Sequence, residues 1–135
     1  MDNVTTSTTG SPTIKSFMDL NTWKKGHQLV LEIYKATGLF PKEELFGLSN
    51  QLRRAAVSFT SNIAEGFSRN SMREKVHFYA MALGSLTELQ NQILIAKDVG
   101  YMPNEVFRQL WDDAIVTNKL ISGLLRKSKT LTKTA

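Results

Sequence analysis

The sequence predicts an all-α protein, an antiparallel up-down-up-down four-helix bundle, on two observations. Four segments repeat apolar residues at intervals of three and four, which is the period of an amphipathic helix. Loops of about three to eight residues, marked by Gly, Pro or a capping residue, separate these segments. Loops this short join helices that pack antiparallel as neighbours. No segment of the sequence alternates in the manner of a half-buried strand.

Composition predicts one domain between two tails. The chain has 135 residues, of which 41% are hydrophobic, enough for a single core. Residues 1–15 are rich in Ser and Thr and contain little that can pack, so we expect a disordered tail there. The bundle is expected over residues 16–127. Residues 128–135 are expected to form a basic, frayed C-terminal tail.

The first helix is expected to begin near Asp19 or Asn21, either of which can cap it, and to end at Gly38. Its inward face is predicted to comprise Trp23, Val30, Ile33, Tyr34 and Thr37. A short helical turn is expected next at Pro41, because Pro suits the first position of a helix.

The second helix contains the stretch QLRRAAVSFTSNIAEG, residues 51–66. Its apolar face is formed by Leu48, Leu52, Ala55, Ala56, Phe59 and Ile63. A polar stripe of Arg54, Ser58, Ser61 and Glu65 runs beside that face. Small residues in this region allow another helix to approach closely. We expect the helix to end between Gly66 and Asn70.

The third helix is expected to begin at Ser71, which forms a capping box with Glu74. Its core residues are predicted to be Tyr79, Ala82, Leu83, Leu86, Leu89, Ile93 and Ala96. Gly100 ends this helix, and Pro103 opens the fourth. The fourth helix presents Phe107, Leu110, Trp111, Ala114, Ile121, Leu124 and Leu125 to the core.

A structural polar seam is predicted between the second and third helices. If the two pair about the turn at residues 68–70, facing residue numbers sum to roughly 138–142, which places Arg54 near Ser85 and Glu88. We interpret Arg54 and Glu88 as a buried ion pair that fixes helix register rather than as catalytic groups. The full seam comprises Arg54, Asn62, Glu65, Ser85 and Glu88.

The motifs for metal binding and catalysis are incomplete. Glu74 and His77 have the Glu-x-x-His spacing of di-iron bundles, but the only other histidine, His27, does not repeat it. Ser58 and Ser61 have no histidine within reach on their own helix, and no Ser or Thr occurs with a base that a third group orients. Phosphate-binding glycine loops do not occur in the sequence. We therefore predict no metal site, no cofactor and no enzymatic activity.

The net charge of +5 is compatible with binding to phosphates. Candidate nucleic-acid-binding residues are Lys24, Lys25, Arg53, Arg69, Arg73, Arg126 and Lys127. Arg69 and Arg73 flank the start of the third helix, where backbone amides and the helix dipole favour an anion. In a ring-shaped oligomer, each weak site would be repeated into a multivalent basic surface.

Apolar residues outside the core stripes predict self-association. The segment from Phe78 to Leu83 is apolar almost all the way round, and the fourth helix carries Val106, Val116 and Leu120 off its main stripe. A bundle with some apolar surface is the alternative. The sequence shows no signal-peptide pattern and no apolar run approaching ~18 residues. We expect a cytoplasmic protein that does not bind membranes.

Two long segments carry a resemblance to a known family. The segments FPKEELFGLSNQLRRAAVSFTSNIAEGFSR and YAMALGSLTELQNQILIAKDVGY resemble a family of bacterial four-helix bundle proteins. This family was first noted as open reading frames within intervening sequences of large-subunit ribosomal RNA genes. It also includes the accessory variability determinant of diversity-generating retroelements. The resemblance covers residues 17–125, nearly everything except the tails.

The resemblance implies a four-helix protomer, assembly into a homopentamer and no enzymatic activity. For the retroelement branch it implies a basic surface that binds nucleic acid, RNA or DNA, and a partner reverse transcriptase. The family's hallmark positions in this chain are Gln51, Arg53, Arg54, Asn62, Glu65, Gly66, Gly84, Ser85 and Glu88. We assign most of them to structure.

Two hypotheses for function follow. The first is a non-enzymatic, homo-oligomeric bundle that binds nucleic acid through a repeated basic surface and acts as an accessory to another machine. The alternative is a protein–protein interaction scaffold, for example one that binds a reverse transcriptase, with no direct role for nucleic acid.

Overall fold

The computed structural model describes residues 13–134, so the first twelve residues of the expected N-terminal tail lie outside the described residues. The model contains four α-helices: α1 Asn21–Thr37, α2 Leu48–Ser68, α3 Met72–Asp98 and α4 Asn104–Thr134. Two short 3₁₀ helices, η2 Phe17–Asp19 and η3 Lys42–Glu44, precede α1 and α2. The described part of the chain contains no strand. The all-α class is confirmed.

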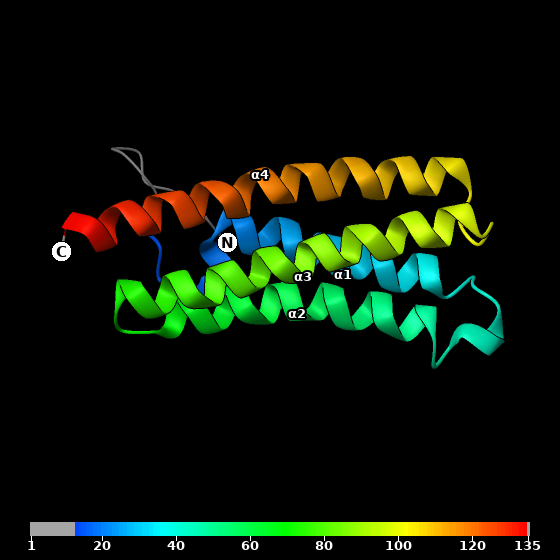
Figure 1. Cartoon of the computed structure of the whole chain (residues 1–135), viewed down its shortest axis with the longest axis horizontal. Coiled ribbons are helices and arrows are strands. Elements are labelled where there is room, and N and C mark those ends of the chain that lie inside the picture. The colour runs from blue at the N-terminus through cyan, green and yellow to red at the C-terminus, as the bar shows by residue number, and fades with distance from the viewer. Residues whose placement is uncertain (1–12, 135) are drawn as a thin grey trace.

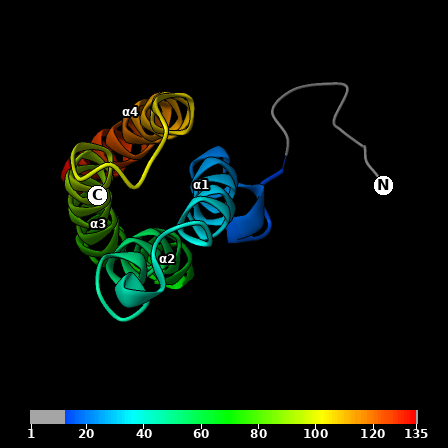
Figure 2. The same ribbon diagram turned by 90° about the vertical axis from the view of Figure 1, so that its right-hand side faces the viewer.

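The four helices form an antiparallel bundle in which each helix reverses the direction of the one before it (Figure 1). Helix α1 packs against α2 and α4, and α3 packs against the same two helices. Seen along the bundle, the helices follow one another around a common axis (Figure 2). Sequence neighbours are therefore neighbours in space, as the short loops predict.

The core lies between the inward stripes of the four helices. The fully buried large side chains include Leu29, Ile33, Leu52, Phe59, Ile63, Leu86, Leu89, Ile93, Leu110 and Ile121. On α3, every predicted core residue is buried except Leu83, which packs against the core while partly buried. The prediction for Tyr34 on α1 is wrong. Its side chain is 47% exposed, because the buried stripe of α1 follows Gly26, Leu29, Ile33 and Ala36 instead.

Helix α1 begins at Asn21, as the sequence predicts, but without the predicted capping interaction. Neither Asp19 nor Asn21 caps this helix. The Asp19 carboxylate instead accepts hydrogen bonds from the backbone amides of Lys15 (2.9 Å) and Ser16 (3.0 Å), which closes a capping box around η2. Leu20 is then the N-cap of α1 and contributes no side-chain bond.

The boundaries from the end of α1 to the start of α4 follow their predicted signals. Gly38 caps the end of α1, and η3 forms the short turn after Pro41. The Ser71 hydroxyl accepts a hydrogen bond from the Glu74 amide at 3.1 Å and starts α3. Gly100 follows α3 with φ +88°, a left-handed conformation that suits glycine.

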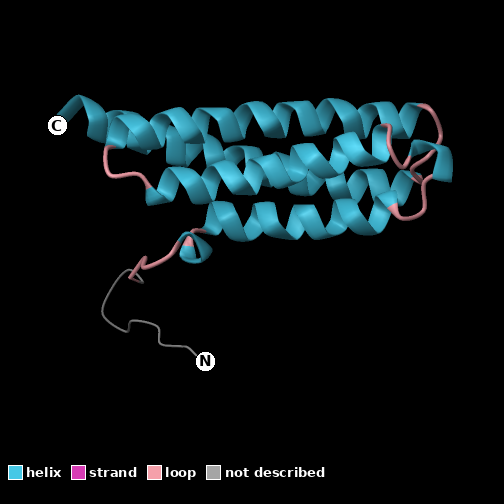
Figure 3. Cartoon of the chain, turned by 90° about the horizontal axis from the view of Figure 1, so that it is seen from below, coloured by secondary structure: helices cyan, strands magenta, loops and turns pink. Residues whose placement is uncertain are grey.

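Helix α4 continues to Thr134, past Ser128, where the sequence analysis places the start of a frayed tail. Ser128 is only 3% exposed, and its carbonyl accepts a hydrogen bond from the Thr132 hydroxyl at 2.9 Å. Lys and Arg also suit the negative end of a helix dipole. The last turns of α4 extend beyond the loop between α2 and α3 (Figure 3).

The close approach of α1 and α2 generates a prediction at Gly26. A Cβ atom at this position would lie 2.7 Å from Cδ2 of the buried Phe59 ring, and closer still to Cε2. We expect Gly26→Ala to lower the free energy of unfolding by about 1–3 kcal/mol, because the ring must move within a packed core. Urea unfolding followed by circular dichroism measures this change.

The matched control is Gly123→Ala on α4, where an added Cβ would meet only the tip of Arg126, at 3.9 Å. This variant should raise the free energy of unfolding by about 0.5–1 kcal/mol, because alanine has the better helix propensity. Equal effects from both substitutions would contradict tight packing at Gly26.

Candidate nucleic-acid interface

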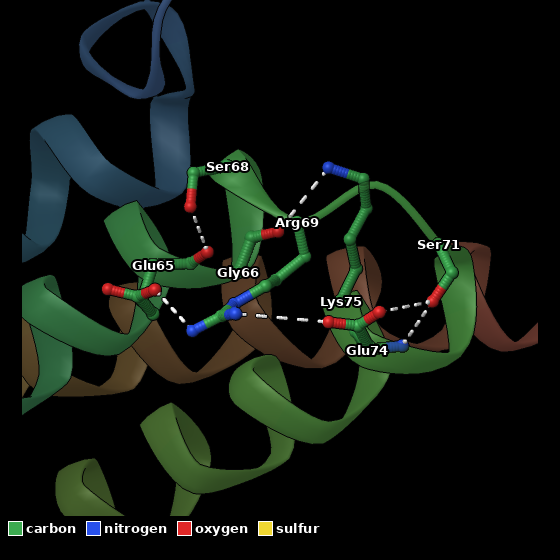
Figure 4. A network of polar contacts seen from close by, with 7 residues as sticks. All are labelled: Glu65, Gly66, Ser68, Arg69, Ser71, Glu74 and Lys75. Carbon is green, nitrogen blue, oxygen red and sulfur yellow. Dashed lines mark hydrogen bonds and ion pairs between the residues drawn. The ribbon is translucent and has the colours of Figure 1, made fainter.

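The turn between α2 and α3 is a closed polar network (Figure 4). Arg69 lies 2.5 Å from Glu65 and 3.9 Å from Glu74, measured between guanidinium nitrogen and carboxylate oxygen. Its guanidinium also lies over the ring of Phe78 at 4.6 Å. Lys75 donates to the last carbonyls of α2, with a distance of 2.6 Å to that of Phe67. These two cations therefore stabilise the turn.

The expectation that Arg69 is available to a phosphate at the start of α3 is corrected by this geometry. Its charge is balanced by two carboxylates, and the first turn of α3 is already capped by Ser71 and Glu74. Arg73 is exposed beside this turn and forms no ion pair within the described residues. Of the two basic residues that flank the helix start, only Arg73 is left as a candidate.

Two more predicted residues have structural contacts. Nε of Arg53 donates to the Thr37 hydroxyl at 2.8 Å, and its guanidinium lies 4.8 Å from the Tyr34 ring centroid. Nζ of Lys25 lies 3.1 Å from the carboxylate of Asp113. Arg53 therefore links α2 to α1, and Lys25 links α1 to α4. Neither offers an uncommitted cation to a ligand.

The remaining predicted residues are exposed. Lys24, Arg73, Arg126 and Lys127 all lie at the surface, as does Lys129, and none of them forms an ion pair in the part of the chain that the structure describes. On α4, Arg126 and Lys129 border a hollow of about 410 Å³, together with Leu83 of α3.

The exposed candidates Lys24, Arg73, Arg126 and Lys127 share one end of the bundle. A cross-section can be drawn through the hydrogen bonds that join Lys25 to Asp113 and Ser58 to Ser85. The start of α1, the turn between α2 and α3 and the end of α4 all lie on one side of it (Figure 1). We call this side the basic end.

The basic end comprises residues 13–24, 61–82 and 114–134, which contain ten Lys or Arg and three Asp or Glu. The rest of the described chain contains seven Lys or Arg and eight Asp or Glu. The stretch 114–134 of α4 has five Lys or Arg and no acidic residue. The positive charge of the protein is therefore concentrated at one end rather than spread over the surface.

The predicted polar seam separates into two groups. Ser58 and Ser85 share a hydrogen bond of 2.8 Å between α2 and α3, and the Asn62 amide donates to the Ser58 carbonyl at 2.9 Å. Glu65 instead pairs with Arg69 in the turn.

The predicted buried ion pair between Arg54 and Glu88 is wrong. Both side chains are exposed, and no ion pair joins them in the described structure. Ser58 pairs with Ser85, which places Glu88 within one residue of the level of Arg54, but both residues lie off the buried stripes of their helices. The charged groups therefore remain solvated at the rim, which avoids the desolvation penalty of a buried pair.

A buried acidic group between α1 and α4 was not predicted. Asp113 is 8% exposed and accepts hydrogen bonds from Lys25 (3.1 Å) and Gln109 (3.3 Å). Glu32 lies beside it and accepts from Gln28 at 3.3 Å. Asp113 is far from the other residues in the sequence, so the sequence could not indicate that they meet. It shows only that Lys25, Gln28 and Glu32 have the spacing of neighbours on one helix.

The two carboxyl groups have different proton affinities. Burial and the neighbouring Asp113 raise the pKa of Glu32 from an ordinary value of 4.5 to about 7. Burial alone would raise the pKa of Asp113, but hydrogen bonds with Glu32 and Lys25 outweigh it and hold the pKa below its ordinary value. Oε1 of Glu32 is buried and gains a partner when the carboxyl is protonated and donates to Asp113.

The described residues contain no group of three or more His, Cys, Asp or Glu placed to hold a metal ion. His77 is exposed, and its ring lies edge-on to that of Phe78 at 5.5 Å. No helix in the described residues has the length and apolar character needed to cross a membrane.

Comparison with known proteins gives a family and a fold. The model of the 23S rRNA-intervening sequence protein family matches residues 18–123. The chain is also similar to a crystal structure of a protein with unknown function from the S23 ribosomal protein family of Bacteroides thetaiotaomicron. The TM-score is 0.69 at 21% sequence identity, over 77% of this chain and 97% of that one. This likeness shows the fold alone. No curated protein matches the chain.

The carboxyl pair predicts a pH dependence of stability. The native protein holds a proton on Glu32 up to about pH 7, whereas the unfolded chain releases it near pH 4.5. The native state therefore binds more protons across this window, and the free energy of unfolding should fall as pH rises through it. We expect a fall of roughly 1 kcal/mol, since solvent screens a half-exposed group. Urea unfolding at pH 5 and pH 8 measures it.

The variant Glu32→Gln should lose most of this slope, because the amide keeps the shape of the protonated acid and does not titrate. Glu43→Gln, on the exposed η3, should keep the slope of the wild type. A slope that survives in Glu32→Gln would refute the assignment.

Proposed function

The chain belongs to the 23S rRNA-intervening sequence protein family, and from this premise we propose that it is a non-enzymatic accessory protein that binds nucleic acid through its basic end. The family is named after intervening sequences in ribosomal RNA genes, which associates these proteins with an RNA-coding locus, and we take RNA as the first ligand to test. The contact would be with phosphates, since the exposed groups are Lys and Arg side chains rather than a deep pocket.

One observation carries the proposal. The last third of α4 presents Arg126, Lys127 and Lys129 at the surface, and this helix has no acidic residue between 114 and 134 to neutralise them. Like charges held close together on a rigid helix repel one another, and a polyanion relieves that repulsion. The turn at Arg69, where acidic residues balance the cations, provides the contrast within the same molecule.

Self-association forms the second part of the proposal. Large apolar side chains are exposed on every helix, among them Leu31 (57%), Val57 (39%), Ile95 (42%) and Val116 (44%). We infer that copies of the chain associate, with five copies as the number suggested by the family resemblance. Assembly would repeat the basic end and raise avidity for a long polyanion.

The same apolar surface favours the alternative function. A scaffold for another protein, such as a reverse transcriptase, would use these side chains and would not need the basic end. Charge reversal at the basic end separates the two functions, because it removes nucleic-acid affinity and leaves the apolar surface intact. Truncation after Leu125 is less suitable, since it would also remove the buried Ser128.

We expect the triple variant R126E/K127E/K129E to bind RNA roughly tenfold to a hundredfold more weakly than the wild type at low salt, because it replaces three cations with anions. The slope of log affinity against log salt concentration should also become less steep by about 2, because each phosphate contact with single-stranded RNA contributes roughly 0.7 to that slope. Fluorescence anisotropy with a labelled oligouridylate at several salt concentrations measures both quantities.

The matched control is K35E/K42E/R108E, which makes the same change in net charge at exposed residues outside the basic end. It should retain affinity within about twofold, if location rather than net charge decides binding. Equal losses in both triple variants would refute the basic end as the site, and no binding of the wild type at low salt would refute the function.

Self-association predicts a native mass several times the 15.2 kDa of the chain. Because burial of the exposed apolar side chains drives association, the assembly should resist high salt. Sedimentation equilibrium over a range of concentrations, at low and high salt, measures this mass. A monomer at all concentrations would contradict the proposed oligomer. It would leave the proposal that the basic end binds nucleic acid unchanged.

A further inference from the structure

A polar pocket lies between α2 and α3, outside the basic end. It has a volume of about 650 Å³, which is within the range of small-molecule sites. Its lining comes from the first half of α2, the second half of α3 and the loop before α2, and includes Phe46, Asn50, Arg54, Ser58, Glu88 and Gln92. Nearly every lining side chain can donate or accept a hydrogen bond.

Gln92 contributes a buried polar group to the wall of this pocket. The residue is only 5% exposed, yet its Oε1 has no hydrogen-bond partner among the described residues. A buried amide oxygen without a partner is unfavourable, so its presence needs an explanation. Ser58, which also lines the pocket, is held in place by the 2.8 Å bond to Ser85.

The groups at the rim have opposite charges and do not neutralise each other. Arg54 and Glu88 both line the pocket, and both are exposed without an ion pair in the described structure. Phe46, which is 90% exposed, offers an aromatic face at the same rim. A cation, an anion and an aromatic ring around one cavity are the groups that recognise a nucleobase by its edges and by its face.

We propose that this pocket binds an unpaired guanine base of RNA, with Phe46 stacking on the ring, Arg54 donating to O6 and N7, and Glu88 accepting from N1–H and N2–H. Guanine alone presents two neighbouring donors on its Watson–Crick edge, which match the two oxygens of a carboxylate. Its O6 and N7 match the forked donors of an arginine. Gln92 and Asn50 supply further amide groups at the wall.

This inference rests on the proposed function, because it adds base recognition to phosphate binding at the basic end. The two sites are separate in the fold. The pocket belongs to the part of the bundle without excess positive charge, whereas the phosphate contacts lie on the last turns of α4. A single nucleotide therefore tests the pocket without an RNA chain that spans both sites.

The experiment is calorimetric titration of the full chain with guanosine 5′-monophosphate, and with the adenosine, cytidine and uridine monophosphates as comparisons. All four share the phosphate, so a difference among them reports the base. We expect the guanine nucleotide to bind tighter than the others by about tenfold or more, the discrimination of one bidentate pair. Glu88→Gln should remove that preference, because an amide cannot accept both guanine donors.

Two variants serve as controls. Glu105→Gln changes an exposed carboxylate on α4 that does not line this pocket, and it should leave the preference for guanine unchanged. Phe46→Ala should lower the affinity for all four nucleotides by about tenfold, since stacking on an aromatic side chain does not depend on the base.

Three outcomes would overturn the inference: equal binding of all four nucleotides, no binding at millimolar concentration, or a guanine preference that survives in Glu88→Gln. A fall in native mass in Glu88→Arg, without any nucleotide binding, would assign the pocket to a second copy of the chain and would also overturn it. Oligouridylate contains no guanine. If it binds the basic end while the pocket fails, the proposed function stands alone.

Discussion

The close approach of helices at small residues is the constraint on which the bundle depends. Gly26 brings α1 against Phe59, and Gly66 brings α2 against Tyr79, where an added Cβ would lie 2.7 Å from the ring. At these points an aromatic ring on one helix fills the space left by a missing side chain on its neighbour. The serine pair on α2 and α3 adds a direct hydrogen bond at the same interface. Side-chain size therefore sets the helix spacing, and with it the register that decides which polar groups meet.

The division of charges follows from that register. Where a cation lies opposite a carboxylate or an orphan carbonyl, as Lys25, Arg69 and Lys75 do, it becomes part of the scaffold. Where no carboxylate or orphan carbonyl faces a cation, as for Arg126, Lys127 and Lys129 on α4, the side chain stays in solvent. A net charge of +5 is modest for a phosphate-binding protein, but its placement at one end strengthens the local field.

The sequence predicted what depends on local spacing. The stripe of α3 and the turn at Gly100 follow from helical period and from glycine's access to positive φ, and both were found. The failures depend on rotation or on distant partners. Tyr34 is one residue round the helix from Ile33, a rotation of about 100°, which separates a buried position from an exposed one. Arg54 likewise lies one residue from the buried Ala55, and its side chain is exposed. Asp113 looked like a surface acid, since its partner Lys25 is 88 residues away.

The same limits apply to the candidate site. The sequence identified Lys24, Arg73, Arg126 and Lys127 as basic but gave no means of separating them from Lys25, Arg53 and Arg69. That separation requires knowing which carboxylates and carbonyls face each side chain, which is a property of tertiary packing. Arg54 and Glu88 illustrate the converse. Their failure to pair leaves two opposite charges beside an orphaned amide in one pocket, and such an arrangement has no role in holding the helices together. A fold that is stable without an ion pair at this position leaves both groups available to a ligand.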